Sequence, residues 1–154
     1  MGLLSNILWA FQKKNYNSIE DFNKEITDYQ TLILKEKASW EPYKLVIDAP
    51  EINVFYEAWI KGKEDMAANE TLLGDESDVF SEDNSDDGMF QVELCAKLKA
   101  SNYTNFPALD LLYQLQNQVS NKELGDHIFF EGLTPQDNEE EKNNIPSYYM
   151  YCGS

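Results

Sequence analysis

Residues 90–99 read FQVELCAKLK and alternate without a break between apolar and polar side chains. This alternation predicts a β-strand with one face in the core and the other toward solvent. Residues 52–60 (INVFYEAWI) alternate less regularly and predict a second strand, with a helix from about Asn53 as the alternative. We expect these two strands to form a hairpin.

The connection between the two strands differs in composition from the rest of the chain. Residues 64–89, called the acidic segment below, contain ten acidic residues and no lysine, with many Ser, Asn and Gly residues. Its apolar residues are few and scattered. Such a composition is typical of a solvated loop, so we expect one domain over residues 1–154 with a loop insertion at 64–89.

Three helices are expected outside the hairpin. Residues 107–121 have apolar side chains at helical spacing after Pro107, which favours a first helical turn. Residues from 18 to the middle thirties follow the same pattern, and Ser18 is placed as a cap. The apolar residues of 3–14 also recur every three or four positions, which predicts a short amphipathic helix.

Short apolar runs at residues 43–48 (YKLVID), 127–131 (HIFFE) and 148–152 (YYMYC) predict further strands. The last two should pair across an acidic loop bounded by proline. Together the elements predict an α+β fold, with a mainly antiparallel sheet of about four or five strands and two or three helices packed on one face. The order of the strands does not follow from the sequence.

The charge balance excludes several classes of function. The chain has 154 residues, 28 of them acidic, and its 12 basic residues are all lysines, so the net charge is −16 at pH 7. A strongly negative chain without arginine is a poor nucleic-acid binder and attracts cations and basic proteins. The apolar run at residues 2–11 is too short to cross a bilayer, and lysines follow it instead of preceding it. We therefore expect a cytoplasmic protein without membrane contact.

The residues needed for catalysis are scarce. His127 is the single histidine, and it lies beside an apolar run that indicates a structural position. Cys95 and Cys152 lack metal-ligand spacing and would form a disulfide only if the fold brought them together. No glycine-rich phosphate loop or nucleophile elbow is present. The sequence predicts a protein that is not an enzyme and needs no cofactor.

One pattern within the acidic segment resembles the start of a calcium loop. Asp83, Ser85 and Asp87 alternate and are followed by Gly88, as oxygen ligands and a turn glycine would be. The twelfth position of the loop falls on Leu94, where a bidentate Glu is needed. A calcium-binding module using residues 83–88 is therefore an alternative function, with a plain loop favoured over it.

The leading hypothesis is a noncatalytic binding protein that occludes a basic protein partner. Charges on a loop accelerate encounter, and aromatic side chains usually supply the binding energy. Core packing is the competing interpretation for the aromatic residues, including the tyrosines at 148, 149 and 151. The predicted partner-binding residues are Tyr56, Trp59, Asp75, Glu76, Asp78, Phe80, Glu82, Asp83, Asp86 and Asp87.

The stretches GDHIFFEGL (125–133) and YYMYCGS (148–154), with the small size, the acidity and the α+β pattern, resemble the immunity proteins of bacterial polymorphic-toxin systems. The resemblance is general and assigns no functional residue. It implies a cytosolic protein that binds and blocks a cognate toxin, commonly a basic nuclease. A third interpretation is a structural or phage-associated accessory protein whose acidity serves solubility.

Overall fold

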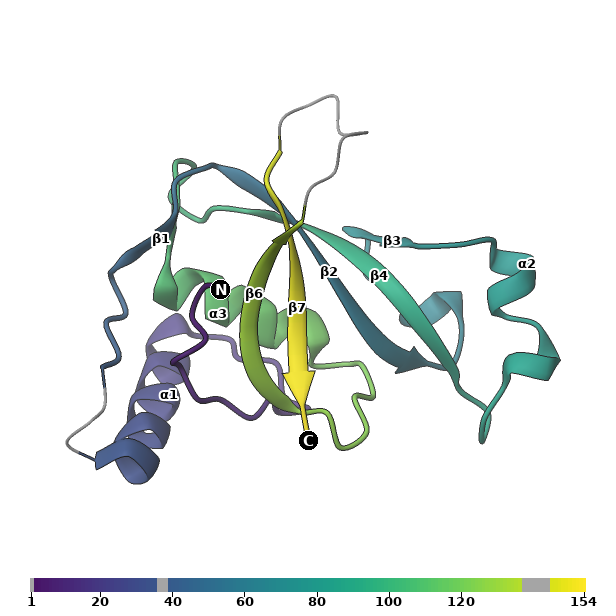
Figure 1. Ribbon diagram of the computed structural model, residues 1–154, viewed down its shortest axis with the longest axis horizontal. Coiled ribbons are helices and arrows are strands. Elements are labelled where there is room, and N and C mark those ends of the chain that lie inside the picture. Colours follow the sequence, from purple (N-terminus) through teal and green to yellow (C-terminus); the bar gives the residue numbers. More distant parts are fainter. Residues whose placement is uncertain (1, 36–38, 137–144) are drawn as a thin grey trace.

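A five-stranded sheet in the order β3-β4-β2-β7-β6 forms the centre of the protein (Figure 1). The computed structural model describes residues 2–35, 39–136 and 145–154. β2 (Glu51–Ile60) and β4 (Phe90–Lys99) pair antiparallel along their whole length. The expected hairpin is confirmed, and the strand interpretation of residues 52–60 holds over the helical alternative.

The two C-terminal strands complete the sheet. β6 (Phe129–Gln136) and β7 (Ser147–Gly153) pair antiparallel, as expected, while β7 runs parallel to β2. β6 ends at Gln136, five residues beyond the end of the predicted strand at 127–131. A register shift lies between Phe130 and Gly132, and the strand continues past it with Gly132 at a positive φ of 109°. Residues 137–144 of the predicted acidic loop lie outside the described residues.

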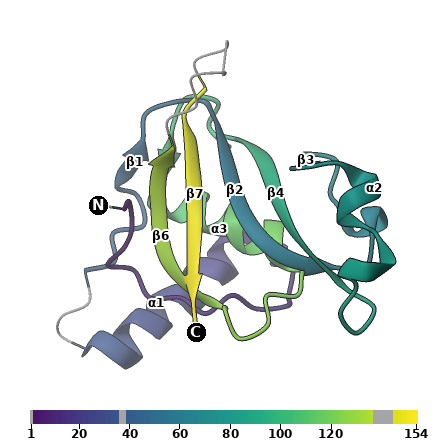
Figure 2. The ribbon, with the colours of Figure 1, turned by 45° about the vertical axis from the view of Figure 1, so that its right-hand side comes forward.

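Two of the three expected helices are confirmed. α1 (Ile19–Leu34) begins after Ser18, whose side-chain oxygen accepts a hydrogen bond from the Asp21 N–H. α3 (Ala108–Val119) follows Pro107 directly. The two helices contact each other on one side of the sheet, and their order with the strands makes an α+β fold (Figures 1 and 2).

The hydrophobic core lies between the sheet and these helices, where alternate residues of β2 and β4 point inward and are buried. β1 (Leu45–Ile47), within the predicted strand at 43–48, pairs with β5 (Phe106–Pro107) in a separate two-stranded sheet. Among the described residues, no helix is both long enough and apolar enough to cross a bilayer. The largest fully buried apolar side chains are Phe22, Ile26, Ile52, Ile60, Leu94, Phe106, Leu111, Leu112, Leu115 and Leu133.

The helix predicted for residues 3–14 is wrong. These residues form a non-helical N-terminal arm that turns at residues 4–6 and runs beside β6, with bridges from Leu3 to Leu133 and from Ala10 to Phe129. Side-chain amides form hydrogen bonds with the backbone of the arm. Gln116, fully buried on α3, accepts from the Trp9 indole N–H and the Gln12 N–H and donates to the carbonyls of Gln12 and Lys14. Tertiary hydrogen bonds and burial thus override the helical spacing.

Candidate functional site

The acidic segment is folded, which corrects the expectation of a plain loop. It contains the short strand β3 (Glu70–Leu72), the single-turn helix α2 (Glu76–Val79) and the 3-10 turn η3 (Glu82–Asn84), and a second 3-10 turn, η2 (Lys63–Asp65), spans its first residues. α2 lies out beyond β3, away from α1 and α3 (Figures 1 and 2). The exposed carboxylates of the segment are Glu64, Asp75, Glu76, Asp78, Glu82, Asp83, Asp86 and Asp87.

A buried ion pair joins the segment to the end of α3. The Lys122 Nζ lies 3.0 Å from a Glu70 carboxylate oxygen, and neither side chain is exposed. The same Nζ donates to the Asp65 carbonyl at 3.0 Å and to the Asn121 side-chain oxygen at 2.7 Å. Glu70 is thus the buried carboxylate of the segment, whereas Asp65 is half-buried and the other eight are exposed. A charge pair removed from water must be well satisfied, so this contact fixes where the segment starts.

Further contacts position the outer part of the segment. Asp75 caps α2 by accepting from the N–H and hydroxyl of Ser77, and these bonds lower the pKa of the Asp75 carboxyl. Phe80 packs against Phe90 of β4 in a T-shaped pair with ring centroids 5.3 Å apart. Phe80 is half-buried in this contact, so its aromatic ring serves mainly to hold the segment on the sheet.

The calcium pattern has a different structural role. Asp86 and Met89 exchange backbone hydrogen bonds of 2.8 and 3.0 Å, and Asp87 and Gly88 between them have φ values of 55° and 81°. This is the two-residue turn that Asp-Gly favours in hairpins. Within the described part of the chain, no group of three or more His, Cys, Asp or Glu residues is placed to hold a metal ion. The spacing that resembled a calcium loop is explained by the turn.

The two aromatic candidates on β2 have different environments. Tyr56 is only 1% exposed and belongs to the core, so the prediction that it contacts a partner at the surface is wrong. Its inward position follows from the alternation of β2, which buries every second residue. Trp59 lies on the opposite face of the strand and is half-buried. Of these two residues, Trp59 is the one available to a partner.

The face of the sheet opposite α3 carries aromatic and acidic side chains together. Tyr149 and Tyr151 of β7 lie on this face with ring centroids 4.8 Å apart. Glu57 of β2 and Glu93 of β4 are direct cross-strand partners on the same face. Like charges directly opposite each other destabilise a sheet, so this pair is not there for stability. No sequence pattern indicates this pair, because Glu57 and Glu93 become neighbours only through strand register.

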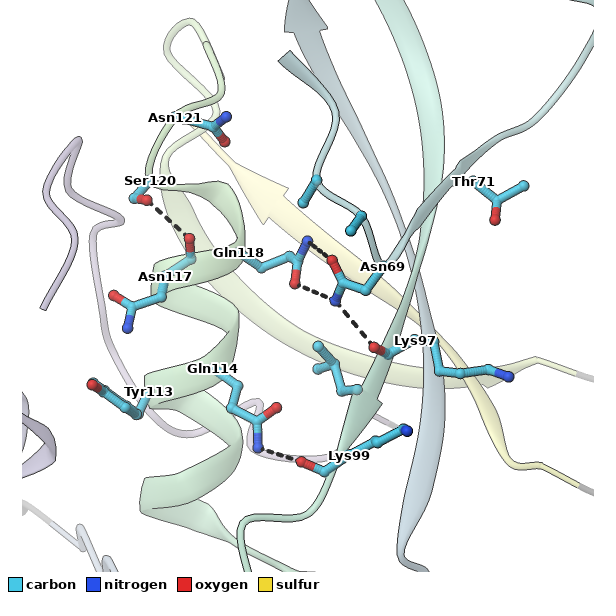
Figure 3. A pocket seen from close by; sticks show the side chains of 13 residues that line it. Asn69, Thr71, Lys97, Lys99, Tyr113, Gln114, Asn117, Gln118, Ser120 and Asn121 are labelled. Carbon is cyan, nitrogen blue, oxygen red and sulfur yellow. Dashed lines mark hydrogen bonds between the residues drawn. The ribbon is translucent and has the colours of Figure 1, made fainter. Parts of the chain in front are cut away.

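An open groove of about 860 Å³ lies between β4, α3 and the start of the acidic segment (Figure 3). Amide side chains fill its wall: Asn69 and Gln118 exchange hydrogen bonds of 2.9 and 3.1 Å, and Gln114 donates to the Lys99 carbonyl. The side chains of Lys97 and Lys99 point away from these amides (Figure 3). The amides bond chiefly to each other and to the backbone. The Asn69–Gln118 hydrogen bonds thus hold the acidic segment on α3.

Residues considered for catalysis are not assembled. His127 is exposed, in a turn before β6 rather than in the predicted strand, and its charged neighbour is Asp126 at 3.5 Å. Cys95 and Cys152 lie on β4 and β7, which β2 separates, and they form no disulfide. Burial, with a smaller contribution from Glu131, raises the pKa of the Cys152 thiol to about 12. A thiol with this pKa is protonated at neutral pH and is a poor nucleophile.

Comparisons with known proteins add no family to this description. No protein-family model, no curated protein and no solved structure matches the chain. The acidic segment and the exposed sheet face are therefore the two surfaces whose geometry and charge indicate a function.

Proposed function

We propose that this protein is a noncatalytic acidic binding protein that occludes a basic protein partner. The observation that carries the proposal is the acidic segment, with eight exposed carboxylates held on a folded scaffold. The buried Lys122–Glu70 pair and the Phe80–Phe90 contact place these charges before any partner arrives. A fixed charge arrangement needs less ordering on binding than a flexible loop does.

The charges and the aromatic residues have separate tasks in this proposal. Exposed carboxylates accelerate the encounter with a basic surface, and the acceleration falls as salt screens the field. Affinity depends more on desolvated anchors, which are usually aromatic residues or arginine. The half-buried Trp59 and the Tyr149–Tyr151 pair are among the aromatic side chains on the exposed sheet face.

The proposal is tested by capturing proteins from a lysate of the source organism on the immobilised chain over a series of salt concentrations. The matched control replaces the eight exposed carboxylates of the acidic segment by Asn or Gln and leaves Glu70 in place. We expect a basic protein to be retained at low salt by the natural chain, to elute as salt rises, and to be retained poorly by the control. If both chains retain the same proteins, or neither retains a basic one, the proposal fails.

The finer form of the proposal is that the partner is a toxin and the chain its immunity protein, located in the cytoplasm. A gene for a basic toxin next to the gene for this chain would identify the partner. Cells that express that neighbouring gene should stop growing, and co-expression of this chain should restore growth. Restoration that is unchanged by neutralising the acidic segment would argue against the electrostatic mechanism.

A further inference from the structure

A cleft opens in the sheet where β2 and β7 separate. The two strands pair in parallel only from Asn53–Ser147 to Phe55–Tyr149 and then diverge (Figure 1). Beyond this point the Trp59 backbone bonds to Glu123, with N–H to carbonyl distances of 2.7 and 3.1 Å. The gap between the strands leaves a cleft of about 310 Å³. This volume is at the small end for ligand sites and suits one side chain better than a cofactor.

The rim of the cleft is aromatic. Trp59 of β2 and Tyr149 and Tyr151 of β7 line it from opposite sides. Tyr151 is 48% exposed, although its ring packs against that of Tyr149. Aromatic faces bind cations through the ring quadrupole, and the planar guanidinium group of arginine stacks on them especially well.

The cleft is also negatively charged. Glu57 lines it, Glu93 lies directly opposite Glu57 on β4, and none of the lining residues is a lysine. Burial first, and then Glu57 and Glu93, raise the pKa of Tyr149 to about 12. The two carboxylates therefore act on the rim of the cleft. Their mutual repulsion would be relieved by a cation bound between them.

Tyr56 also belongs to the lining of the cleft, but its side chain is 1% exposed and faces the core, so we assign it no contact with the bound group. A guanidinium supplies five N–H donors in a planar fork, which suits the two oxygens of the Glu57 carboxylate while its faces stack on the aromatic rim.

We propose that this cleft takes one arginine side chain of the basic protein partner, held between Trp59 and the two tyrosines with its charge on Glu57 and Glu93. This inference rests on the proposed function and adds the recognition chemistry. The acidic segment draws the partner in, and the cleft supplies the desolvated anchor that long-range attraction alone lacks.

The test is an NMR titration of the full chain with N-acetyl-arginine amide, following the indole N–H of Trp59. The citrulline analogue, which is neutral and nearly the same shape, and the lysine analogue are the comparison probes. We expect a saturable shift with arginine, in the millimolar range, at least threefold weaker binding of lysine, and no saturable shift with citrulline. Equal responses to all three probes, or an unsaturable response to arginine, would overturn the assignment.

The matched variants separate a specific cleft from a general negative field. E57Q with E93Q removes two charges at the cleft, and D78N with D86N removes two from the acidic segment. We expect the first pair to weaken arginine binding at least fivefold and the second to leave it within twofold. The first pair should also unfold no more easily than the natural chain, because a like-charge contact is removed. Equal effects of the two pairs would overturn the cleft assignment.

The capture experiment distinguishes this inference from the proposed function. If a basic protein is retained and the E57Q/E93Q variant retains it equally, the cleft is not the anchor, although the protein still binds a basic partner. If arginine amide binds at the cleft but no basic protein is retained, the cation site stands and the proposed function fails. A captured protein that needs both the segment and the cleft supports both.

Discussion

Replacing Lys122 by Met removes the cation of the buried ion pair and keeps most of the apolar stem of the side chain. Glu70 then retains one hydrogen bond, from the Ala67 N–H at 2.7 Å, while its second carboxylate oxygen has none even in the natural chain. The Asp65 carbonyl and the Asn121 side chain each lose a donor as well. An uncompensated buried charge is therefore the main consequence.

Removing one partner of a buried pair costs about 3–5 kcal/mol. The free energy of unfolding of a domain is about 5–15 kcal/mol, so Lys122→Met should remove a third or more of it. Urea denaturation followed by circular dichroism measures this loss. Lys63→Met is the control, because its pair with Glu76 is exposed on both sides and should contribute less than about 1 kcal/mol.

A second substitution tests the reason for the loss. Replacing Glu70 by Leu in the Lys122→Met background removes the orphan carboxylate and should recover most of the stability, because apolar replacement of buried pairs is often neutral. The double-mutant cycle should give a coupling energy of about 2 kcal/mol or more. The reasoning is refuted if Lys122→Met costs no more than Lys63→Met, or if the double variant is as unstable as the sum of the single ones.

Two further predictions concern the N-terminal arm and the response to high pH. Gln116→Leu leaves the Trp9 indole N–H and the backbone of Gln12 and Lys14 without their partners, and urea denaturation should show a loss of about 2–4 kcal/mol; an unchanged midpoint would contradict this. Burial and Glu131 raise the pKa of Cys152 from 9.0 to about 12, so the stability that this thiol contributes is full below pH 9.0 and is lost as pH rises toward 12. Cys152→Ala should show a smaller decline of stability over this range, and parallel pH profiles would contradict the assignment.

The elements predicted correctly are those whose local pattern agrees with their tertiary environment. β4 is half-buried along its length, so strict alternation identifies it. α1 and α3 each bury one face, which gives helical spacing, and Ser18 adds a local cap. In the N-terminal arm the same spacing does not indicate a helix, because Ile7, Trp9 and Phe11 are buried in a non-helical chain whose backbone is hydrogen-bonded by side chains of α1 and α3.

The candidate site was predictable only in its charge. The exposed carboxylates of the acidic segment follow from composition, since solvated acidic residues need no partner. The cleft does not follow from composition. It forms where β2 and β7, which are distant in the sequence, separate, and its charge depends on the register of Glu57 with Glu93. Tyr56 and Trp59 are three residues apart in one strand, so their side chains lie on opposite faces. Tyr56 faces the core and Trp59 faces the exposed side of the sheet.

The position of the acidic segment along β4 has a consequence for any test that deletes it. Asn69 and Leu73, on either side of β3, form backbone hydrogen bonds with Lys97 and Glu93 and so cover the outer edge of β4. At the opposite edge of the sheet, the N-terminal arm covers β6 through its bridges to Phe129 and Leu133. An unpaired strand margin is a template for pairing with another chain. A chain without residues 64–89 would therefore tend to associate with its own copies through β4. Loss of partner binding in such a chain would report aggregation rather than missing charge, whereas substitution of the exposed carboxylates leaves both margins covered.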